Sequence, residues 1–198
     1  YKRQDPESTN LLLVAHCPER VLPGKIMEEM ATNDRVIGGL SPLASERAQH
    51  LYSSFCNGEM LLTNATTAEM AKLTENSFRD VNIAFANELS IISDKLGIDV
   101  WELIELANHH PRVNILNPGP GVGGHCIAVD PWFIVSSAQK ESKLIRTARE
   151  VNDGKPVYVI DKITEAVEAE NANSIAALGI AFKPDIDDLR ESPALSIV

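Results

Sequence analysis

The chain of 198 residues is poor in basic side chains and has no long apolar run, and each shortage argues against a class of protein. Lys and Arg number 18 against 28 Asp and Glu, a formal net charge of −10. Nucleic acid is therefore not an expected partner, because phosphate backbones are bound by clustered cations. No apolar stretch approaches the roughly 20 residues that a membrane-spanning helix needs, so we expect no membrane partner.

Cysteine is also scarce, and its three positions do not form a disulfide framework. Cys17, Cys56 and Cys126 are odd in number and lie far apart, so we expect free thiols in a reducing, cytoplasmic compartment. The pairs His16-Cys17 and His125-Cys126 put donors next to each other, which is not the usual spacing of zinc ligands. The sequence therefore predicts no metal site.

Both ends of the chain resemble cut ends. The sequence opens on Tyr1 rather than Met and stops at Val198 within an apolar run. We therefore expect the chain to be a segment of a longer protein.

The first third of the chain alternates strand-like and helix-like patterns. Short apolar runs predict strands at 11–15, 34–39 and 60–63. Between the last two, Ser41-Pro42 opens a helix that continues to about residue 55, with proline in its first turn. Strand, helix and strand in this order are typical of an α/β layer, which predicts the end of a larger sheet.

From Thr66 the pattern changes to one long helix. Thr66 and Glu69 have the spacing of a capping box, and Lys95-Leu96-Gly97 supplies a basic last turn and a glycine stop. At ~1.5 Å per residue such a helix is about 45 Å long, which favours packing against a partner subunit or another domain. A second helix at about 98–108 should end before Pro111.

The rest of the chain is predicted to be irregular, then helical, then extended. Residues 111–131 are too rich in glycine and proline for regular structure. Helical patterns resume at Pro131, and Gly154-Lys155-Pro156 predicts a break before a further helix that ends near Glu170. The apolar run at 174–183 predicts a strand, as at the opening of another α/β domain.

The loop that precedes Pro131 has the most distinctive chemistry. Its glycines let the backbone approach a ligand closely and offer N–H donors to anionic groups. Cys126 lies among them, and free N–H groups can lower the pKa of a thiol and so favour the nucleophilic thiolate. The alternative is that Cys126 is a small buried hydrophobe. The glycine run only mimics a dinucleotide fingerprint, because no strand precedes it and no helix begins on its third glycine.

Polar side chains of the long helix form a second candidate cluster. Lys72, Asn76 and Arg79 follow one another at i, i+4 and i+7, so they share one helix face. A solvated stripe explains this pattern, and so does a polar cleft in which Lys and Asn stabilise an alkoxide and Arg holds a phosphate. Glu19 and Arg20 follow the first strand, where α/β folds place ligand residues, although exposed loop charges are the simpler interpretation.

Four segments, in this order, resemble the UDP-glucose/GDP-mannose dehydrogenase family. They are CPERVLPGK at 17–25, AKLTENSFRDVNIAFANEL at 71–89, NPGPGVGGHCIAVDPWF at 117–133 and LGIAFKPDIDDLRESPA at 178–194. The resemblance implies three parts: the α/β end of a Rossmann-type NAD-binding domain at 1–65, a mainly α-helical dimerisation domain at 66–172, and the start of a second, UDP-binding α/β domain at 173–198. The glycine fingerprint of the NAD site is absent from the chain, so we expect the chain alone to be inactive.

The resemblance also implies a reaction. It is the oxidation of the C6 alcohol of a nucleotide sugar to a carboxylate with two NAD⁺ in succession. The implied substrate is UDP-N-acetyl-D-mannosamine, with UDP-N-acetylglucosamine or UDP-glucose as alternatives. Another alternative, for the chain alone, is a helical dimerisation module without catalysis.

Roles for individual residues follow from the same resemblance. Lys72 and Asn76 are implied to stabilise an oxyanion, and Cys126 to form a thiohemiacetal and then a thioester. Glu19 and Asp130 are implied to assist proton transfer when water hydrolyses the thioester.

The resemblance further implies a set of substrate contacts. Arg20 and Val21 lie beside the sugar, and Gly123 gives backbone next to the nucleophile. The polar groups of the substrate are bound by Arg79, His110 and Arg112, and the UDP end by Phe182, Lys183 and Arg190. A homodimer forms through the long helix at 66–96, and Arg112 reaches into the neighbouring subunit's site.

Overall fold

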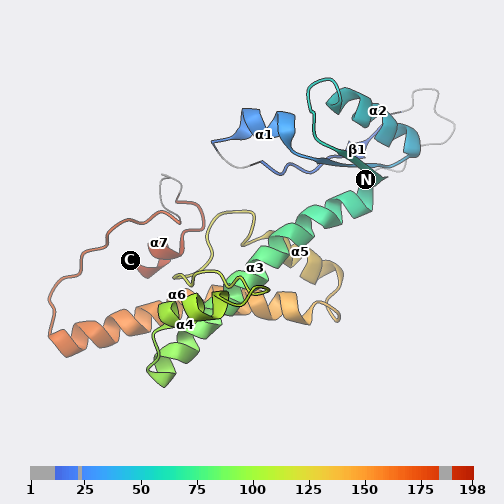
Figure 1. The fold of residues 1–198 in the computed structure, drawn as a ribbon. Helices are drawn as coiled ribbons and strands as arrows, with labels where there is room; N and C mark the ends of the chain where they lie inside the picture. The colour runs from blue at the N-terminus through green and yellow to red at the C-terminus, as the bar shows by residue number, and fades with distance from the viewer. Residues whose placement is uncertain (1–11, 22–23, 183–188) are drawn as a thin grey trace. The chain divides into compact units, whose positions relative to one another are not determined.

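The computed structural model describes residues 12–21, 24–182 and 189–198 (Figure 1). The chain divides into two units, Tyr1–Lys72 and Leu73–Val198. Within the described ranges, no helix combines the length and the apolar character that crossing a membrane requires.

The first unit contains a three-stranded sheet in the order β1-β2-β3. Its elements are β1 (Ala15–His16), α1 (Ile26–Thr32), β2 (Arg35–Gly39), α2 (Pro42–Tyr52) and β3 (Met60–Asn64). Strand β1 is antiparallel to β2, whereas β2 and β3 are parallel and joined by α2. The α/β layer predicted from the sequence is therefore confirmed.

Helix α2 is fixed to the sheet by its own first residues. Ser41 caps the helix, since its hydroxyl accepts the N–H of Ala44 at 3.2 Å. The hydroxyl of Ser45 accepts the Gly39 N–H at 2.8 Å and donates to the Thr63 carbonyl at 3.2 Å. Ser45 thus ties the carboxyl ends of β2 and β3 together.

Two details of the first unit differ from the sequence predictions. The strand expected at 11–15 is a short ladder at Ala15–His16, and residue 11 lies outside the described residues. Helix α1 was not predicted. Its only sequence signal is a pair of acidic residues, Glu28 and Glu29, in the first turn, and none of its residues is buried.

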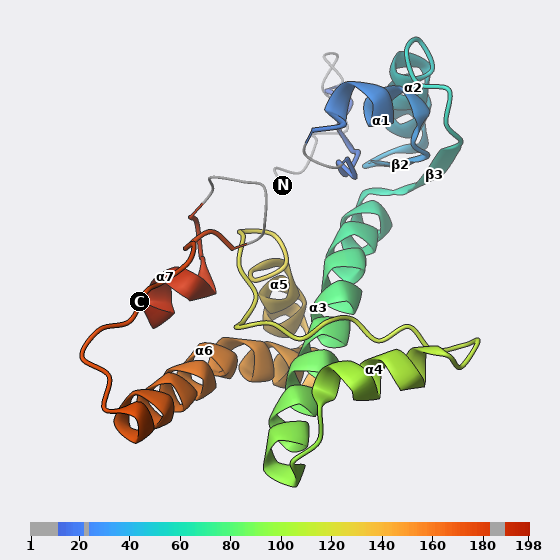
Figure 2. The same ribbon diagram turned by 60° about the vertical axis from the view of Figure 1, so that its left-hand side comes forward.

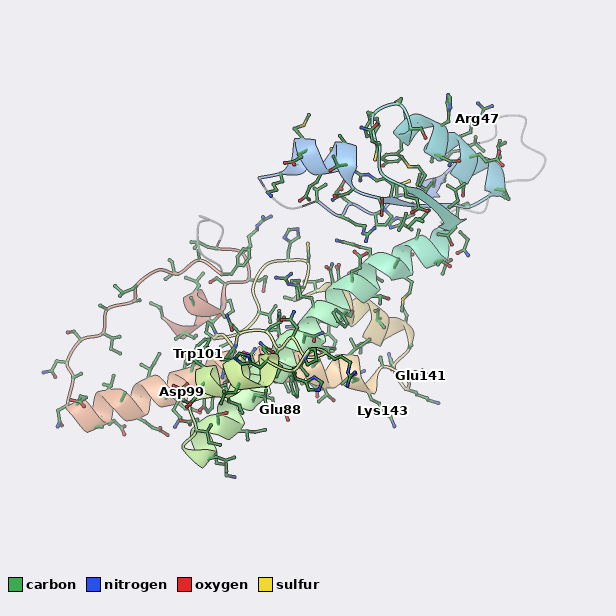
Figure 3. The ribbon with its side chains drawn as sticks, in the orientation of Figure 1. Arg47, Glu88, Asp99, Trp101, Glu141 and Lys143 are labelled. Carbon is green, nitrogen blue, oxygen red and sulfur yellow. The ribbon has the colours of Figure 1, made fainter. Side chains whose placement is uncertain are left out.

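The second unit is helical. Helix α3 (Ala65–Leu96) enters it from the first unit, and α4 (Val100–Asn108), α5 (Asp130–Ser137), α6 (Lys143–Glu170) and α7 (Pro193–Ile197) follow. Figure 2 shows α6 crossing α3, with α5 beside α3. The long helix predicted at 66–96 is confirmed. So is the helix at 98–108, which Asp99 caps by accepting the Trp101 N–H at 2.8 Å (Figure 3).

The predicted break at Gly154-Lys155-Pro156 is wrong. Helix α6 runs through Pro156, and the interruption lies earlier, between Ser137 and Lys143. Proline disfavours a helix interior because it removes one N–H donor. Here the helix is held by α3 on both sides of the proline, through Asn152 before it and Tyr158 after it.

The strand predicted at 174–183 is also wrong for the residues that the structure describes. Residues 173–182 form no ladder, and Leu178 is 97% exposed. A strand is stable only when neighbouring strands take up its backbone hydrogen bonds. The described residues offer no such neighbour to this segment.

Candidate active site

The turn that carries Cys126 is anchored by backbone hydrogen bonds on both sides. Upstream, the Gly124 N–H donates to the Arg190 carbonyl at 3.3 Å. Downstream, the Cys126 carbonyl accepts the N–H groups of Val129 at 3.2 Å and Asp130 at 2.8 Å. The Cys126 side chain is exposed, so the alternative of a buried hydrophobe is wrong.

Asp130 joins this turn to the long helix. It is the first residue of α5, and its Oδ2 accepts the side-chain N–H of Asn76 at 2.5 Å. Both side chains are half-buried. The structure of the second unit therefore brings together three of the residues predicted to be catalytic, Asn76, Cys126 and Asp130.

The glycines of the loop contact protein rather than open space. A Cβ on Gly123 would lie 2.3 Å from Phe182 Cβ and 2.8 Å from the Glu191 carbonyl oxygen. Gly121 has a φ of +148°, and a Cβ there would lie 2.9 Å from Pro193 Cβ. The sequence attributed these glycines to ligand approach, but close packing against Phe182, Glu191 and Pro193 already requires two of them.

The remaining predicted catalytic residues, Glu19 and Lys72, belong to the first unit. Arg35 holds the Glu19 carboxylate, with Nη1 at 3.0 Å from Oε1 and 3.2 Å from Oε2. The guanidinium of Arg35 is buried, donates to the Met30 carbonyl at 3.1 Å and lies over the Tyr52 ring. Sequence reasoning missed Arg35, because a single arginine at the start of a strand carries no signal of a distant carboxylate.

The predicted substrate-binding residues have varied surroundings. Arg79, His110, Arg112 and Arg190 are exposed, whereas Arg20, Val21, Gly123 and Phe182 are half-buried. The Arg112 N–H donates to His110 Nδ1 at 3.3 Å. Lys183 lies outside the described residues.

A pocket in the first unit was not predicted. It has a volume of about 390 Å³ and lies at the carboxyl ends of β2 and β3, where parallel sheets bind ligands. Its polar lining comes from Ser41, Ser45, Glu46, Thr63 and Asn64. Among the described residues, no group of three or more His, Cys, Asp or Glu side chains is placed to hold a metal ion.

Two adjoining matches identify the family. Residues 2–56 match the NAD binding domain of the UDP-glucose/GDP-mannose dehydrogenase family, and residues 66–154 match its central domain. The chain belongs to this family.

Individual UDP-glucose/GDP-mannose dehydrogenase family members align with 93% of the chain. The chain is 66% identical to UDP-N-acetyl-D-mannosamine dehydrogenase of Campylobacter jejuni, over 46% of that protein. It is 64% identical to NDP-N-acetyl-D-galactosaminuronic acid dehydrogenase of Ralstonia nicotianae, over 44% of that protein. The solved UDP-D-ManNAc dehydrogenase of Pyrococcus horikoshii is 50% identical, with a TM-score of 0.86 over 45% of its length. The chain thus spans less than half the length of these relatives.

Proposed function

We propose that the chain is the nucleophile-bearing part of an NAD-dependent nucleotide-sugar 6-dehydrogenase. The observation that carries this proposal is the connection from Asn76 through Asp130 to the turn of Cys126. An exposed thiol and a carboxylate belong to one anchored segment, and an amide donor on α3 is hydrogen-bonded to that carboxylate. Thiol, acid and oxyanion donor are the groups that oxidation of an alcohol to an acid through a covalent intermediate requires.

The proposed chemistry proceeds through a bond to sulfur. The C6 alcohol first loses a proton and a hydride and becomes an aldehyde. The Cys126 thiolate then adds to C6, and the carbonyl oxygen takes up a proton, which gives a thiohemiacetal. Loss of a second hydride from C6, together with the proton of the C6 hydroxyl group, leaves a thioester. Water attacks its carbonyl carbon, the C–S bond breaks, and the thiolate and the sugar carboxylate are released.

Four side chains assist these steps in the proposal. The Lys72 ammonium and the Asn76 amide stabilise the negative charge on the C6 oxygen. Glu19 and Asp130 accept and return protons during hydrolysis. Arg35 keeps the Glu19 carboxylate in one orientation, since both carboxylate oxygens accept from its Nη1.

NAD, when bound, accepts the hydride that leaves C6, and the four-electron oxidation needs two NAD per turnover. The match of residues 2–56 to an NAD binding domain supports this cofactor. The pocket at the carboxyl ends of β2 and β3 is suited to bind part of the NAD molecule. Its hydroxyl and amide groups, from Ser41, Thr63 and Asn64, are suited to the ribose and amide groups of a dinucleotide.

The proposed substrate is UDP-N-acetyl-D-mannosamine, which the names of several relatives with 64 to 66% identity support. A relative of similar identity is named for N-acetyl-D-galactosaminuronic acid, so another UDP-acetamido sugar is the second candidate. Substrate contacts are proposed for Arg20, Val21, Arg79, His110, Arg112, Gly123, Phe182, Lys183 and Arg190. Comparison of kcat/KM for UDP-N-acetylmannosamine, UDP-N-acetylglucosamine and UDP-glucose distinguishes the sugars.

The proposal includes a homodimer and a domain division. Helix α3 exposes Phe78, Phe85 and Ile92 at seven-residue intervals, with exposed fractions of 71, 54 and 44%. Such a stripe supports packing of this helix against a second copy. We place the NAD-binding part at 1–65, the dimerisation part at 66–172 and the start of the UDP-binding part at 173–198. Three free cysteines support a cytoplasmic location.

Replacement of the nucleophile tests the proposal. In a full-length dehydrogenase that contains this chain, Cys126→Ala should abolish formation of the sugar acid, because no thioester can form. Cys17→Ala, which removes a thiol from the first unit, is the matched control and should keep its activity. The measurement is acid product by mass spectrometry together with NADH absorbance. Normal acid production by Cys126→Ala would refute the proposed mechanism.

A further inference from the structure

The glycine loop has a third anchor, which comes from the buried face of α3. The Gly119 N–H donates to Asn87 Oδ1 at 2.9 Å, across the point where the chain between α4 and α5 passes over α3 (Figure 2). The Asn87 side chain is fully buried, with 0% exposure. Gly119 lies upstream of Cys126 in the same loop.

Asn87 is itself held by a chain of hydrogen bonds to α6. Its Nδ2 donates to Asn152 Oδ1 at 2.8 Å, and Asn152 Nδ2 donates to Asp80 Oδ1 at 2.8 Å. Arg149 Nη1 donates to the same carboxylate oxygen at 2.6 Å. Asp80, Arg149 and Asn152 are at most 1% exposed.

The groups at the two ends of this series of hydrogen bonds determine the orientation of the Asn87 and Asn152 side-chain amides. The Gly119 N–H can only donate, and an ionised carboxylate at Asp80 can only accept. Asn152 must therefore direct its NH₂ group to Asp80 and its oxygen to Asn87. Asn87 must in turn direct its oxygen to Gly119. The acceptor for the loop is thus fixed in position, because a flipped amide would leave buried groups unpaired.

We propose that Asn87 is a positioning residue, which fixes the start of the nucleophile loop and through it the place of Cys126. The loop then has three anchors within the second unit: Asn87 at Gly119, the Arg190 carbonyl at Gly124, and the Cys126 carbonyl with Asp130. The catalytic importance of Asn87 rests on the proposed role of Cys126. The hydrogen bond between Asn87 and Gly119 does not depend on that role.

Two variants separate the anchor from general stability. Asn87→Leu removes the acceptor of the Gly119 N–H, whereas Asn152→Leu breaks the same buried chain one bond further from the loop. Both should lower the free energy of unfolding, because each leaves buried partners unpaired. Asn87→Leu should speed hydrogen exchange at Gly119 by roughly tenfold, for the loss of one hydrogen bond. Asn152→Leu should speed it less, because the Asn87 oxygen remains to accept the Gly119 N–H although its orientation is no longer fixed. Equal acceleration in both variants would overturn the proposal.

The unmodified chain provides a test that needs no variant. In the chain as it is, the Gly119 amide should exchange at least about tenfold more slowly than in an unfolded peptide. Exchange at the unfolded rate would show that Asn87 does not hold the amide. This measurement by NMR stands even if Asn87→Leu fails to fold.

Reactivity and activity then connect the anchor to Cys126. In Asn87→Leu the rate of Cys126 alkylation by iodoacetamide should change several-fold, and in Asn152→Leu it should stay within about twofold of the original. In a full-length dehydrogenase, Asn87→Leu should lower kcat about tenfold. If exchange and alkylation change but kcat does not, the anchor is confirmed and the proposed function of Cys126 fails. If neither exchange nor alkylation changes, the positioning proposal fails by itself.

Discussion

In the second unit, α3 has one polar face and one apolar face, and it is the polar face that the chain covers. The face covered by the chain is polar or small, with Ser77, Asp80, Ala84 and Asn87 buried. The face left exposed carries large apolar side chains, Phe78, Phe85, Ile92 and Leu96. In a helix of an isolated domain the apolar face is expected inside.

The difference shows that the covered face is selected by specific bonds rather than by apolar area. Buried polar groups are costly unless they are paired, and α6 supplies partners for Asp80 and Asn87. The apolar face has the composition of a surface that another protein surface covers. Each face therefore predicts a different kind of mutational effect.

The largest expected effect comes from breaking the polar face. Arg149→Leu should lower the free energy of unfolding by about 3–5 kcal/mol, because it leaves the buried Asp80 carboxylate without its cation. Burial already raises the pKa of Asp80, and Arg149 opposes that shift. The loss should therefore be greatest at neutral pH and shrink as pH falls and the carboxyl group takes up a proton.

Urea unfolding followed by circular dichroism measures this loss. The matched control is Asp80→Leu/Arg149→Leu, which removes both charges and leaves the Asn152 bond to the backbone carbonyl of residue 80. The double variant should be more stable than Arg149→Leu alone. If the single and the double variant have the same free energy of unfolding, the Asp80–Arg149 ion pair does not account for the stability of the polar face.

A substitution on the apolar face of α3 should have a smaller effect, and that effect should be on self-association rather than on the stability of the chain. Phe85→Asp should weaken the proposed homodimer tenfold or more, because burying a phenylalanine contributes about 1.5–3 kcal/mol. Sedimentation equilibrium of the chain measures the dissociation constant. Glu168→Gln, a change at an exposed position of α6, should leave it unchanged. An unmodified chain that stays monomeric at high micromolar concentration contradicts the dimer.

The smallest effect lies at the exposed margin of the α3–α6 contact. Asp94 accepts from Tyr158 Oη at 2.5 Å and pairs with Lys162 Nζ at 2.9 Å. These hydrogen bonds hold the pKa of Asp94 below its ordinary value of 3.8. Its contribution to stability is therefore present above the unfolded pKa and disappears as pH falls through the lower, folded pKa.

Asp94→Asn is the variant that isolates this contribution. The original chain should be slightly more stable than Asp94→Asn at pH 7, and the two should converge as pH falls through the folded pKa of Asp94. Urea midpoints over a pH series give the comparison. A difference that persists unchanged at pH 2 would show that charge on Asp94 is not responsible.

Local patterns predicted the elements that depend on neighbouring residues in sequence. The stop at Gly97 placed the end of α3 correctly, and the expected start lies one residue after the observed one. The capping box at Thr66 is wrong, because Asn64 caps the helix by accepting the Thr67 N–H at 2.8 Å. The path of α6 through Pro156 was not predictable, because its support comes from α3. The strand expected at 174–183 failed for a similar reason, since a strand depends on neighbours that local sequence does not specify.

The candidate site divides in the same way. Glycine and cysteine in one loop, and Lys72 and Asn76 one turn apart, were sufficient to nominate it. Arg35 and Asn87 were missed, because their partners Glu19 and Gly119 are distant in sequence. Nothing in the local spacing distinguishes Asn87 from Asn82, whose amide donates to the Phe78 carbonyl within its own helix.

The sequence by itself determined the approximate bounds of β2, α2, β3, α3 and α4, the position of the glycine loop and the family resemblance, because these depend on short-range propensity and on residue order. Only the tertiary structure decided which face of α3 the chain covers and which amide holds Gly119. A period of 3.6 residues defines two faces of a helix, but the hydrogen-bond partners that favour one of them come from α6 and the loop.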